Sequence, residues 1–503
     1  MDVNVGLDRL LRGERALKAK AKVIAKRERY ARGDHDLPYA PEGINQEYDD
    51  LRKQAPANYI GIAMTAPVQR LRADGIRTGL GDEADAKVWR AWQTNRMDQR
   101  QDLAYASMLK HGRGIVSCWP NLEDRSKPII RPESLELVHI EMDPDDPFTP
   151  LWAVKIYTVQ ESSPLTQVMW LPDSLTATKS IGIVYDSTSM MRFERGGFAA
   201  SAGWEMVKDG THPMRRVPFA LYDFQVDAMG QPWSAMDALI PQQDAINTIR
   251  FNTLLAMQFS AFRQRIVTGF DPRATDKDGN FLYQQNEDGT PKVDAHGRAI
   301  PLLNTPGRVG VDRLLAFPGG DTKVFDLAES NLKNYIEVLS SFLVQFFSTA
   351  QIPPQYLLSQ MANLSGDALA GAESTLASLV KELQLAAGEG NESLAELAWY
   401  AMGETEEFTP SAETVWADAE ARSFAQIVDA IVKLISTGFP RRGAFEMIPG
   451  ATATKVDRWL EMAEDEAFAN RLQAAARAFE DVTPPEPVND QTEITDDAPT
   501  VGG

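Results

Sequence analysis

The sequence predicts an α+β protein in which long helices are separated by β-rich and turn-rich segments. Residues 236–262 and 327–350 carry apolar side chains at the three- and four-residue spacing of one helix face. Residues 114–224 alternate short apolar runs with turns, a pattern typical of a small antiparallel sheet or barrel. A turn-rich excursion, residues 263–326, joins the two long helices. This order of helix, excursion and returning helix organises the rest of the chain.

The N-terminal 235 residues are expected to form one mixed region that opens with a basic helix. Residues 1–32 hold ten Lys and Arg residues against four Asp and Glu residues, a net charge of +6, whereas the whole chain carries −20. A protein that grips DNA over a broad surface would be basic overall, so the total charge argues against that class. The basic helix is interpreted either as a solvated helix packed on its leucines or as a contact for nucleic acid or another acidic surface.

The β-rich region is expected to follow two short helices. Residues 82–94 and 98–111 have helical spacing, and Gly112 is placed to end the second helix. The run Asp143 to Pro147 contains three carboxylates, but its two prolines favour an exposed turn over a cation site.

The two long helices have clear start and stop signals. Ser234 is placed as the N-cap of the first, with Asp237 at the third helical position. At 1.5 Å per residue this helix is a rod of about 40 Å, which needs neighbours along its length. The second helix ends before Pro353 and Pro354, and its apolar stripe consists of Leu332, Ile336, Leu339, Leu343 and Phe346.

The excursion carries three turn signals between short apolar runs. Gly279, Gly289 and Gly297 each follow Asp or His and supply the positive φ that tight hairpin turns of the primed types need. Asp276 and Asp278 resemble the start of a calcium loop, but the glycine comes too early and no Glu stands at the twelfth position. We therefore expect hairpins and no metal site.

The C-terminal part is expected to be helical until an acidic tail. A helix over residues 367–408 contains Gly388 and Gly390, which favour a kink. Residues 409–479 are predicted to form a short crossing and three helices. The last segment, residues 480–503, is acidic and proline-rich and lacks Lys and Arg, so it is expected to be disordered.

Composition and motifs predict a protein that is not an enzyme and needs no cofactor. The 503 residues are enough for two to four domains, and no apolar run is long enough for a secretion signal or a membrane span. Cys118 is the only cysteine, which excludes an intramolecular disulfide and a multi-cysteine metal site. Cys118 is expected to be a buried small side chain, because no histidine is placed to activate it. A phosphate-binding Gly-x4-Gly-Lys-Ser/Thr motif is absent, so an ATP motor would have to be a partner.

Several segments in the right order resemble the portal proteins of tailed bacteriophages, specifically the siphophage-type family of head-to-tail connectors. The early segment resembles the family's Tyr-x-x-Gly-x-His signature, here Tyr30, Gly33 and His35. Four later blocks extend the resemblance over roughly residues 30 to 400. They contain Asn58 with Pro67 and Arg70, then Trp92, Asn95 and Asp98, then Pro241, Asp244 and Asn247, and finally Ile352, Pro353, Pro354 and Tyr356.

The resemblance implies a portal fold with named parts. They are a wing with a β-rich region (1–235), a first stem helix (236–262), a small α/β clip (263–326), a second stem helix (327–350), a tunnel loop (351–366), a long wing and crown helix (367–408), a helical crown (409–479) and the acidic tail (480–503).

The resemblance also implies a function. Such a protein forms a ring, usually a dodecamer, at one capsid vertex of the virion, after assembly in the host cytoplasm. The ring is the channel through which double-stranded DNA is packaged and ejected. Its partners are the large terminase subunit, a head-tail connector or adaptor protein, and the major capsid and scaffolding proteins, and it is expected to nucleate procapsid assembly. The alternative is another phage assembly or connector protein, or a nucleic-acid-processing enzyme without a recognisable catalytic motif.

Two sets of residues are predicted to act. The clip turns at Gly279, Gly289 and Gly297 are expected to present the surface that meets terminase and connector proteins. The other set is uncharged and is expected to touch DNA weakly in the channel, although the same loop could simply turn the chain and pack on a neighbouring subunit. Its members are Gln355, Tyr356, Ser359, Gln360, Met361 and Asn363.

Overall fold

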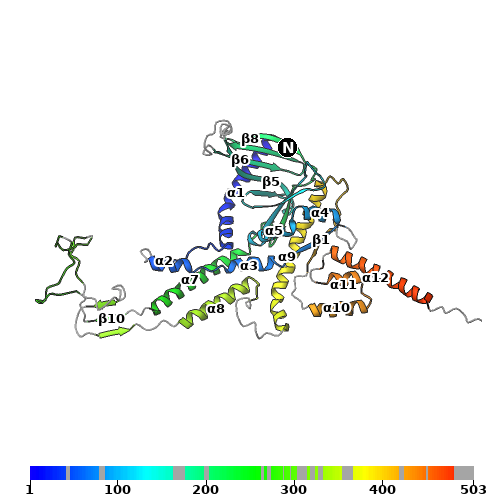
Figure 1. Cartoon of the computed structure of the whole chain (residues 1–503). Coiled ribbons are helices and arrows are strands. Elements are labelled where there is room, and N and C mark those ends of the chain that lie inside the picture. Colours follow the sequence, from blue (N-terminus) through cyan, green and yellow to red (C-terminus); the bar gives the residue numbers. More distant parts are fainter. Residues whose placement is uncertain are drawn as a thin grey trace, which may run out of the picture. The chain divides into compact units, whose positions relative to one another are not determined.

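The computed structural model describes most of the chain in two units, residues 1–419 and residues 420–503. The residues described are 1–40, 46–78, 85–162, 176–197, 203–261, 265–268, 273–286, 288–294, 296–302, 314–317, 323–326, 332–353, 366–417, 424–448, 451 and 453–480. The first unit combines helices and strands, as the α+β prediction requires (Figure 1).

The N-terminal region contains two antiparallel sheets. The larger has the order β4 (Val138–Met142), β5 (Pro150–Ser162), β6 (Thr176–Tyr185), β7 (Ser189–Gly196) and β8 (Glu205–Thr211). The smaller has the order β3 (Ile129–Glu133), β2 (Arg113–Trp119) and β9 (Phe219–Asp223). The β-rich prediction for residues 114–224 is therefore confirmed.

Helix α1 (Val3–Ala31) packs on strands β4, β5 and β6 of the larger sheet (Figure 1). Its buried face brings Leu10 against Trp152, Val154 and Phe193. Gly13 allows the approach, because a Cβ there would lie 2.9 Å from Val154. The interpretation of α1 as a helix packed on its leucines is confirmed for this face.

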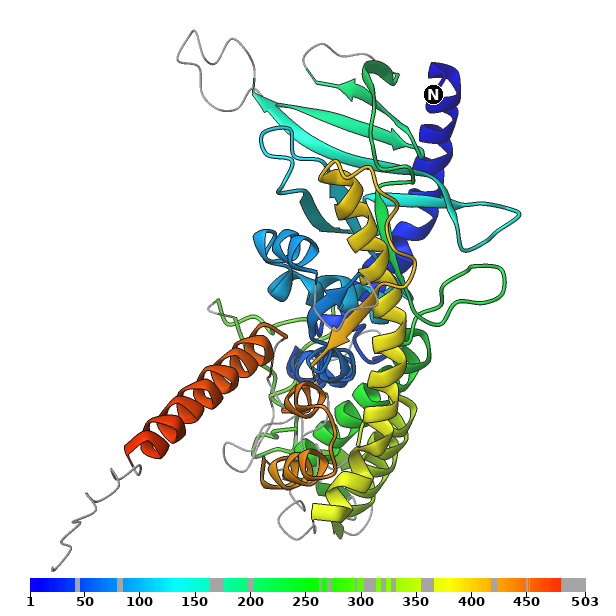
Figure 2. The same ribbon diagram turned by 90° about the vertical axis from the view of Figure 1, so that its right-hand side faces the viewer.

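The main core lies where the remaining N-terminal helices meet the smaller sheet and helix α9 (Gly366–Ala401). These helices are α3 (Tyr59–Val68), α4 (Ala86–Thr94) and α5 (Met97–His111). Helix α2 (Gln46–Gln54) precedes them and contacts the later helix α7 (Met236–Ala261). Gly112 ends α5 with a φ of +82°, as predicted. Figure 2 shows α9 crossing the smaller sheet, which it contacts through β2 and β9.

Helix α9 runs unbroken through Gly388 and Gly390, so the predicted kink is wrong. Tertiary packing explains the second glycine. A Cβ at Gly390 would lie 2.4 Å from the ring of Tyr222, whose hydroxyl donates to the buried Asn391 side chain at 3.0 Å. Gly390 therefore permits close contact between α9 and β9 in place of bending the helix.

The segment after α9 also differs from the prediction. Residues 409–419 were expected to be a crossing at the start of a helical region, but strand β13 (Glu413–Trp416) pairs antiparallel with β1 (Ala73–Arg77). The Trp416 ring lies 6.0 Å from that of Tyr105, which anchors β13 to the main core. The strand therefore belongs to the first unit, and the second unit begins at residue 420.

The second unit contains α10 (Phe424–Ser436), α11 (Arg441–Glu446) and α12 (Ala453–Glu480), the three helices predicted there. A small core of Ile427, Ile431 and Ala444 joins α10 and α11. The predicted disordered tail lies outside the described residues except for Glu480, which ends α12. Among the helices that the structure describes, none is both long and apolar enough to cross a membrane.

Candidate functional site

The two long helices lie side by side, and the hairpins lie between them in sequence. Helix α7 spans Met236–Ala261 and α8 spans Leu332–Thr349, close to the predicted 236–262 and 327–350. The end of α8 is fixed in the main core, where Phe346 and Phe347 are buried beside the Tyr59 ring.

The apolar stripe predicted on α8 is only partly covered within one chain. Phe346 is buried, but Ile336 is 62% exposed. Other apolar side chains of the pair are also exposed, namely Met257 at 51%, Val338 at 46% and Val344 at 43%. A monomer therefore leaves several apolar side chains of this helix pair in water, on more than one side of α8.

The residues of the Tyr-x-x-Gly-x-His segment meet the first third of α7. The Tyr30 hydroxyl donates to the Asp244 carboxylate at 2.7 Å. The Asn247 amide donates to His35 Nδ1 at 3.1 Å, and His35 Nε2 donates to the Tyr30 carbonyl at 3.1 Å. Segments more than 200 residues apart in sequence are thus joined by side-chain hydrogen bonds.

Gln243 on α7 holds the first turn of α3. Its side chain is fully buried, its amide oxygen accepts from the backbone N–H groups of Tyr59 at 3.1 Å and Ile60 at 3.2 Å, and its amide nitrogen donates to the Ala57 carbonyl at 2.8 Å. These N–H groups are the ones that a helix start leaves without intrahelical partners. Asn58 caps the same turn by accepting from the Gly61 N–H at 2.8 Å.

We call this arrangement the α7 junction, made of Tyr30, His35, Gln243, Asp244 and Asn247. Burial lowers the pKa of His35 below its usual value. Burial raises the pKa of Asp244, although the Tyr30 hydroxyl donates to it. His35 accepts at one ring nitrogen and donates at the other, which is the pattern of a neutral imidazole. The junction is a polar network suited to holding helices in place, and its histidine is already fully engaged.

An ion pair adds a second contact between α7 and α1, beside the one made by Tyr30. The Arg27 guanidinium donates to both carboxylate oxygens of Asp237, at 3.0 and 2.7 Å. Ser234 precedes the helix and its hydroxyl accepts from the Met236 N–H at 3.0 Å, which confirms that it caps this end. The predicted third-position role of Asp237 is wrong, because the helix begins at Met236 and the Asp237 carboxylate binds Arg27.

The three predicted hairpin turns lie in one module, residues 273–302. Gly279, Gly289 and Gly297 have φ values of +89°, +81° and +75°. In the first turn the Gly279 N–H donates to the Asp276 carbonyl at 3.2 Å, and the Asp276 N–H donates to the Asn280 carbonyl at 2.9 Å. This is a type I turn followed by a left-handed glycine, so the hairpins are confirmed but the primed turn type is wrong.

The module closes on itself through rings of backbone hydrogen bonds. The Ala274 N–H donates to Leu302, the Leu302 N–H to Leu282, and the Leu282 N–H to Ala274, each at 2.7 Å. A second ring of the same kind joins Gln284, Ile300 and Lys292. The first ring thus joins the first hairpin to the segment that follows the third, and the second ring joins the second and third hairpins.

The hairpin module exposes apolar side chains and buries few. Phe281, Leu282 and Tyr283 are 38–43% exposed, and Val293 is 55% exposed. Asp276 and Asp278 form part of its turn, and no group of three His, Cys, Asp or Glu residues able to hold a metal ion occurs among the residues described. The module is a small polar and apolar surface suited to protein contact.

Next to the module the chain forms a three-stranded sheet with β10 (Arg265–Thr268) in the centre. β11 (Leu314–Phe317) pairs parallel to β10, and β12 (Lys323–Asp326) pairs antiparallel to it. Sequence reasoning assigned this excursion to hairpins and missed the parallel pair.

The six residues predicted to touch DNA all lie outside the described residues. The description stops at Pro353 and resumes at Gly366, so the geometry of Gln355 to Asn363 stays a prediction.

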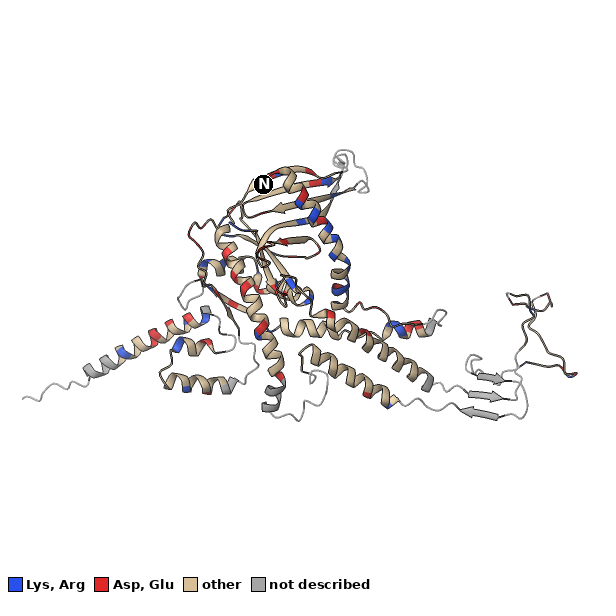
Figure 3. Ribbon diagram, turned by 180° about the vertical axis from the view of Figure 1, so that it is seen from behind, with Lys and Arg blue, Asp and Glu red and all other residues tan. Residues whose placement is uncertain are grey.

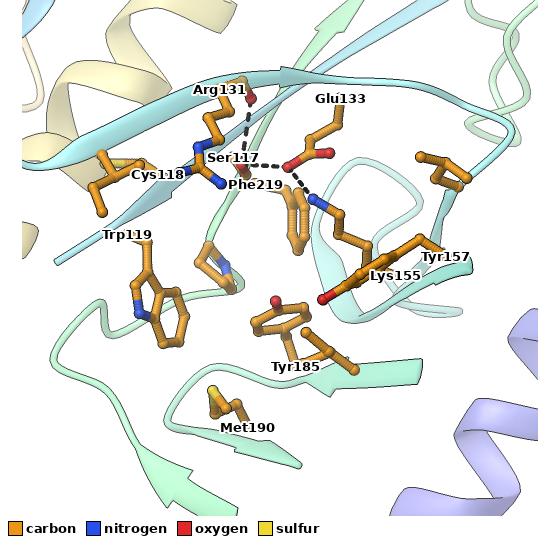
Figure 4. Close-up of a pocket in the computed structure, with 14 residues that line it drawn as sticks. Ser117, Cys118, Trp119, Arg131, Glu133, Lys155, Tyr157, Tyr185, Met190 and Phe219 are labelled. Carbon is orange, nitrogen blue, oxygen red and sulfur yellow. Dashed lines mark hydrogen bonds and ion pairs between the residues drawn. The ribbon is translucent and has the colours of Figure 1, made fainter. Parts of the chain in front are cut away.

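A cavity of about 530 Å³ between the two N-terminal sheets tests the enzyme alternative (Figure 4). Glu133 accepts from the Ser117 hydroxyl and from the Lys155 ammonium, both at 2.7 Å. Cys118 is buried and burial raises the pKa of its thiol, as its predicted role requires. No histidine is among the side chains that line this cavity, and its Glu133 carboxylate is shared between Ser117 and Lys155.

Sequence reasoning missed the role of Gln243. The available signal was the pair of amides Gln243 and Asn247, four residues apart on the predicted helix. Such spacing places both on one helix face, where burial demands hydrogen-bond partners.

Comparisons with known proteins agree with one another. The family model described as phage portal protein, SPP1 Gp6-like, matches residues 6–468. The portal protein of Mycobacterium phage L5 is 25% identical over 431 residues, covering 80% of this chain and 78% of that protein. The portal protein of Mycobacterium phage D29 is 24% identical over 401 residues, covering 76% of this chain and 73% of that protein.

Proposed function

Because the chain belongs to the SPP1 Gp6-like family of phage portal proteins, we propose that it forms the ring at one capsid vertex through which double-stranded DNA is packaged and ejected. A portal protein is a structural component of the virion, the connector between head and tail. The match over residues 6–468 is the observation that carries the proposal, because it includes both long helices and the excursion between them.

The exposed apolar side chains of α7 and α8 support a ring of identical subunits. Ile336, Val338, Val344 and Met257 would be covered by the same helices of neighbouring copies. A head-to-tail interface that closes by rotation gives a ring, and we propose the dodecamer usual for this family.

The hairpin module supports the docking proposal. Its exposed Phe281, Leu282, Tyr283 and Val293 sit beside acidic turns and fit a protein partner. We propose that this module, with turns at Gly279, Gly289 and Gly297, meets the large terminase subunit during packaging and a head-tail connector or adaptor protein afterwards.

The segment between α8 and α9 is proposed to touch DNA in the channel. Gln355, Tyr356, Ser359, Gln360, Met361 and Asn363 are uncharged. Such side chains touch phosphates only weakly, whereas a basic lining would bind them tightly and slow passage. Gln360→Lys with Asn363→Lys is expected to leave the ring intact and to slow packaging.

The remaining partners follow from the same role. We propose that the ring assembles in the host cytoplasm, contacts the major capsid and scaffolding proteins, and nucleates the procapsid. It performs no catalysis and needs no cofactor.

The direct test is the assembly state of the purified full chain. Negative-stain microscopy and native mass spectrometry are expected to show closed rings with a central channel. A chain that stays monomeric across protein and salt concentrations would contradict the proposal. Ile336→Asp tests the proposed interface, and it is expected to weaken assembly without unfolding α8, because Ile336 is already exposed.

A further inference from the structure

Helix α1 presents a basic row away from its buried face. At about 100° per residue, the buried residues Leu10, Leu17 and Ile24 fall within a narrow sector. Arg15 and Lys22 fall on the reverse side, and Lys18 falls on the flank, about 100° from the centre of that sector. We call these three cations the α1 stripe. Figure 3 shows Lys and Arg residues along this helix.

None of the three α1 stripe cations forms an ion pair with a described residue outside α1, and the same holds for Lys20, which lies nearer the buried face. Arg12 donates to Glu141 at 2.8 Å and Arg27 to Asp237, so these side chains fasten the helix to the body. Arg15 and Lys22 are exposed and form no ion pair with any residue that the structure describes. Lys18 pairs with Glu14, but its side chain stays 74% exposed.

Glu14 keeps its own partners without Lys18. The Arg195 guanidinium and the Trp204 indole N–H also donate to it, at 3.1 and 3.2 Å. Although partial burial alone would raise its pKa, these hydrogen bonds and the one from Lys18 lower it to about 2. Lys18 is therefore free to exchange Glu14 for another anion at small cost.

We propose that the α1 stripe is a contact for the phosphate backbone of double-stranded DNA, a second DNA contact apart from the loop between α8 and α9. The inference rests on the proposed function, which brings DNA to this protein. Residues 1–32 carry +6 in a chain of −20, so this helix is where a polyanion meets the least repulsion.

A duplex fits the α1 stripe better than a neighbouring acidic subunit does. Cores of protein interfaces are depleted in lysine and rely on aromatic or arginine anchors. The stripe consists of two lysines and one arginine, with alanines such as Ala19 and Ala25 exposed beside it and no aromatic side chain among them. Exposed lysines bind phosphate as point charges, without sequence preference.

The test measures DNA affinity against salt with the assembled full-length protein. The probe is a fluorescein-labelled 30-base-pair duplex of random sequence. Three phosphate contacts give a slope of about −2.7 in a plot of log affinity against log salt, or about a 40-fold loss between 50 and 200 mM salt. The triple variant, with Arg15→Gln, Lys18→Gln and Lys22→Gln, is expected to have a slope that is less steep by about 2.7.

A matched control removes the same charge elsewhere. Lys53, Lys87 and Lys127 are exposed lysines that pair with Asp49, Glu404 and Asp124. Their replacement by Gln is expected to change the slope of log affinity against log salt by less than about 1.

Each outcome decides the inference. A stripe variant with the wild-type slope would overturn it. A stripe variant that no longer forms rings, when the control variant does, would assign the α1 stripe to a second copy of this chain and would also overturn it. If the wild-type chain remains monomeric, and if the triple Gln variant flattens the dependence of its DNA affinity on salt, the result would support the DNA contact and contradict the proposed function.

Discussion

Gln243→Met is a direct test of the α7 junction. Methionine keeps the length and approximate volume of the side chain but removes its amide. The change removes the hydrogen bonds of 2.8–3.2 Å to the Tyr59 and Ile60 N–H groups and to the Ala57 carbonyl. The Tyr59 N–H and the Ala57 carbonyl remain bonded to each other at 3.0 Å, so of these groups only the Ile60 N–H is left without a partner. Ile60 is fully buried and its N–H cannot reach water, whereas Tyr59 and Ala57 are half-buried.

The expected cost follows from these exposures. An unsatisfied buried polar group costs about 1–3 kcal/mol, so the unpaired Ile60 N–H predicts a loss of about 2 kcal/mol in the local opening free energy. Since about 1.4 kcal/mol is a factor of ten, this corresponds to about 30-fold faster amide exchange. Hydrogen exchange of the peptide covering residues 57–68, read by mass spectrometry, measures it locally.

Gln242→Met provides the control one residue away. The Gln242 amide donates to the Ala238 carbonyl and to the Thr349 hydroxyl at the end of α8, and none of its bonds reaches α3. Exchange in residues 57–68 should therefore stay at the wild-type rate. Equal rates in wild type and Gln243→Met would refute the idea that Gln243 holds the first turn of α3.

Three further predictions rest on separate contacts. Burial lowers the pKa of His35 in the folded chain, so its contribution to stability is present above the unfolded pKa of about 6.5 and is lost as pH falls below it. His35→Gln should melt with a smaller difference between pH 7.5 and 5.5 than wild type, and an equal difference would count against a neutral buried His35. Gly390→Ala should lower the melting temperature, because its Cβ would meet the Tyr222 ring at 2.4 Å, at a cost of about 1–3 kcal/mol. Gly388→Ala, with no neighbour nearer than 3.6 Å, should instead raise stability by about 0.5–1 kcal/mol, so equal shifts in the two variants would disprove the packing argument. Gly279→Val should disrupt its hairpin, since valine strongly disfavours a φ of +89°, and should weaken pull-down of the large terminase subunit while rings still form. Undiminished pull-down would remove this turn from the docking surface.

The sequence predicts best the elements whose signals are local. The long helices follow from apolar periodicity, and the hairpins of the module follow from glycines after Asp or His. The hairpin type was wrong because a glycine with positive φ is compatible with primed turns and also with a type I turn followed by a left-handed residue. Choosing between them requires the backbone of the preceding residues.

Long-range contacts were harder to predict. Strand β13 is only four residues long and follows acidic and polar residues, so its pairing with β1, over 300 residues earlier, has no local signature. Gly390 was interpreted by its intrinsic helix propensity, but the Tyr222 ring determines its role. In the α7 junction, the motif residues were recognised as separate blocks, and only the fold places Tyr30 and His35 on Asp244 and Asn247.

The spacing of the α7 junction has a mechanical consequence. Asp237, Gln243, Asp244, Asn247 and Arg250 each bond a different part of the N-terminal region, and they occupy about 140° of the helix circumference over almost four turns. A rod held only by aliphatic side chains can rotate about its axis by small steps and repack. A rod held along a line of directional bonds cannot, because one step of rotation breaks them all together. Helix α7 therefore resists rotation about its own axis. A torque applied at its far end is transmitted through these hydrogen bonds to the N-terminal region and does not rotate the helix.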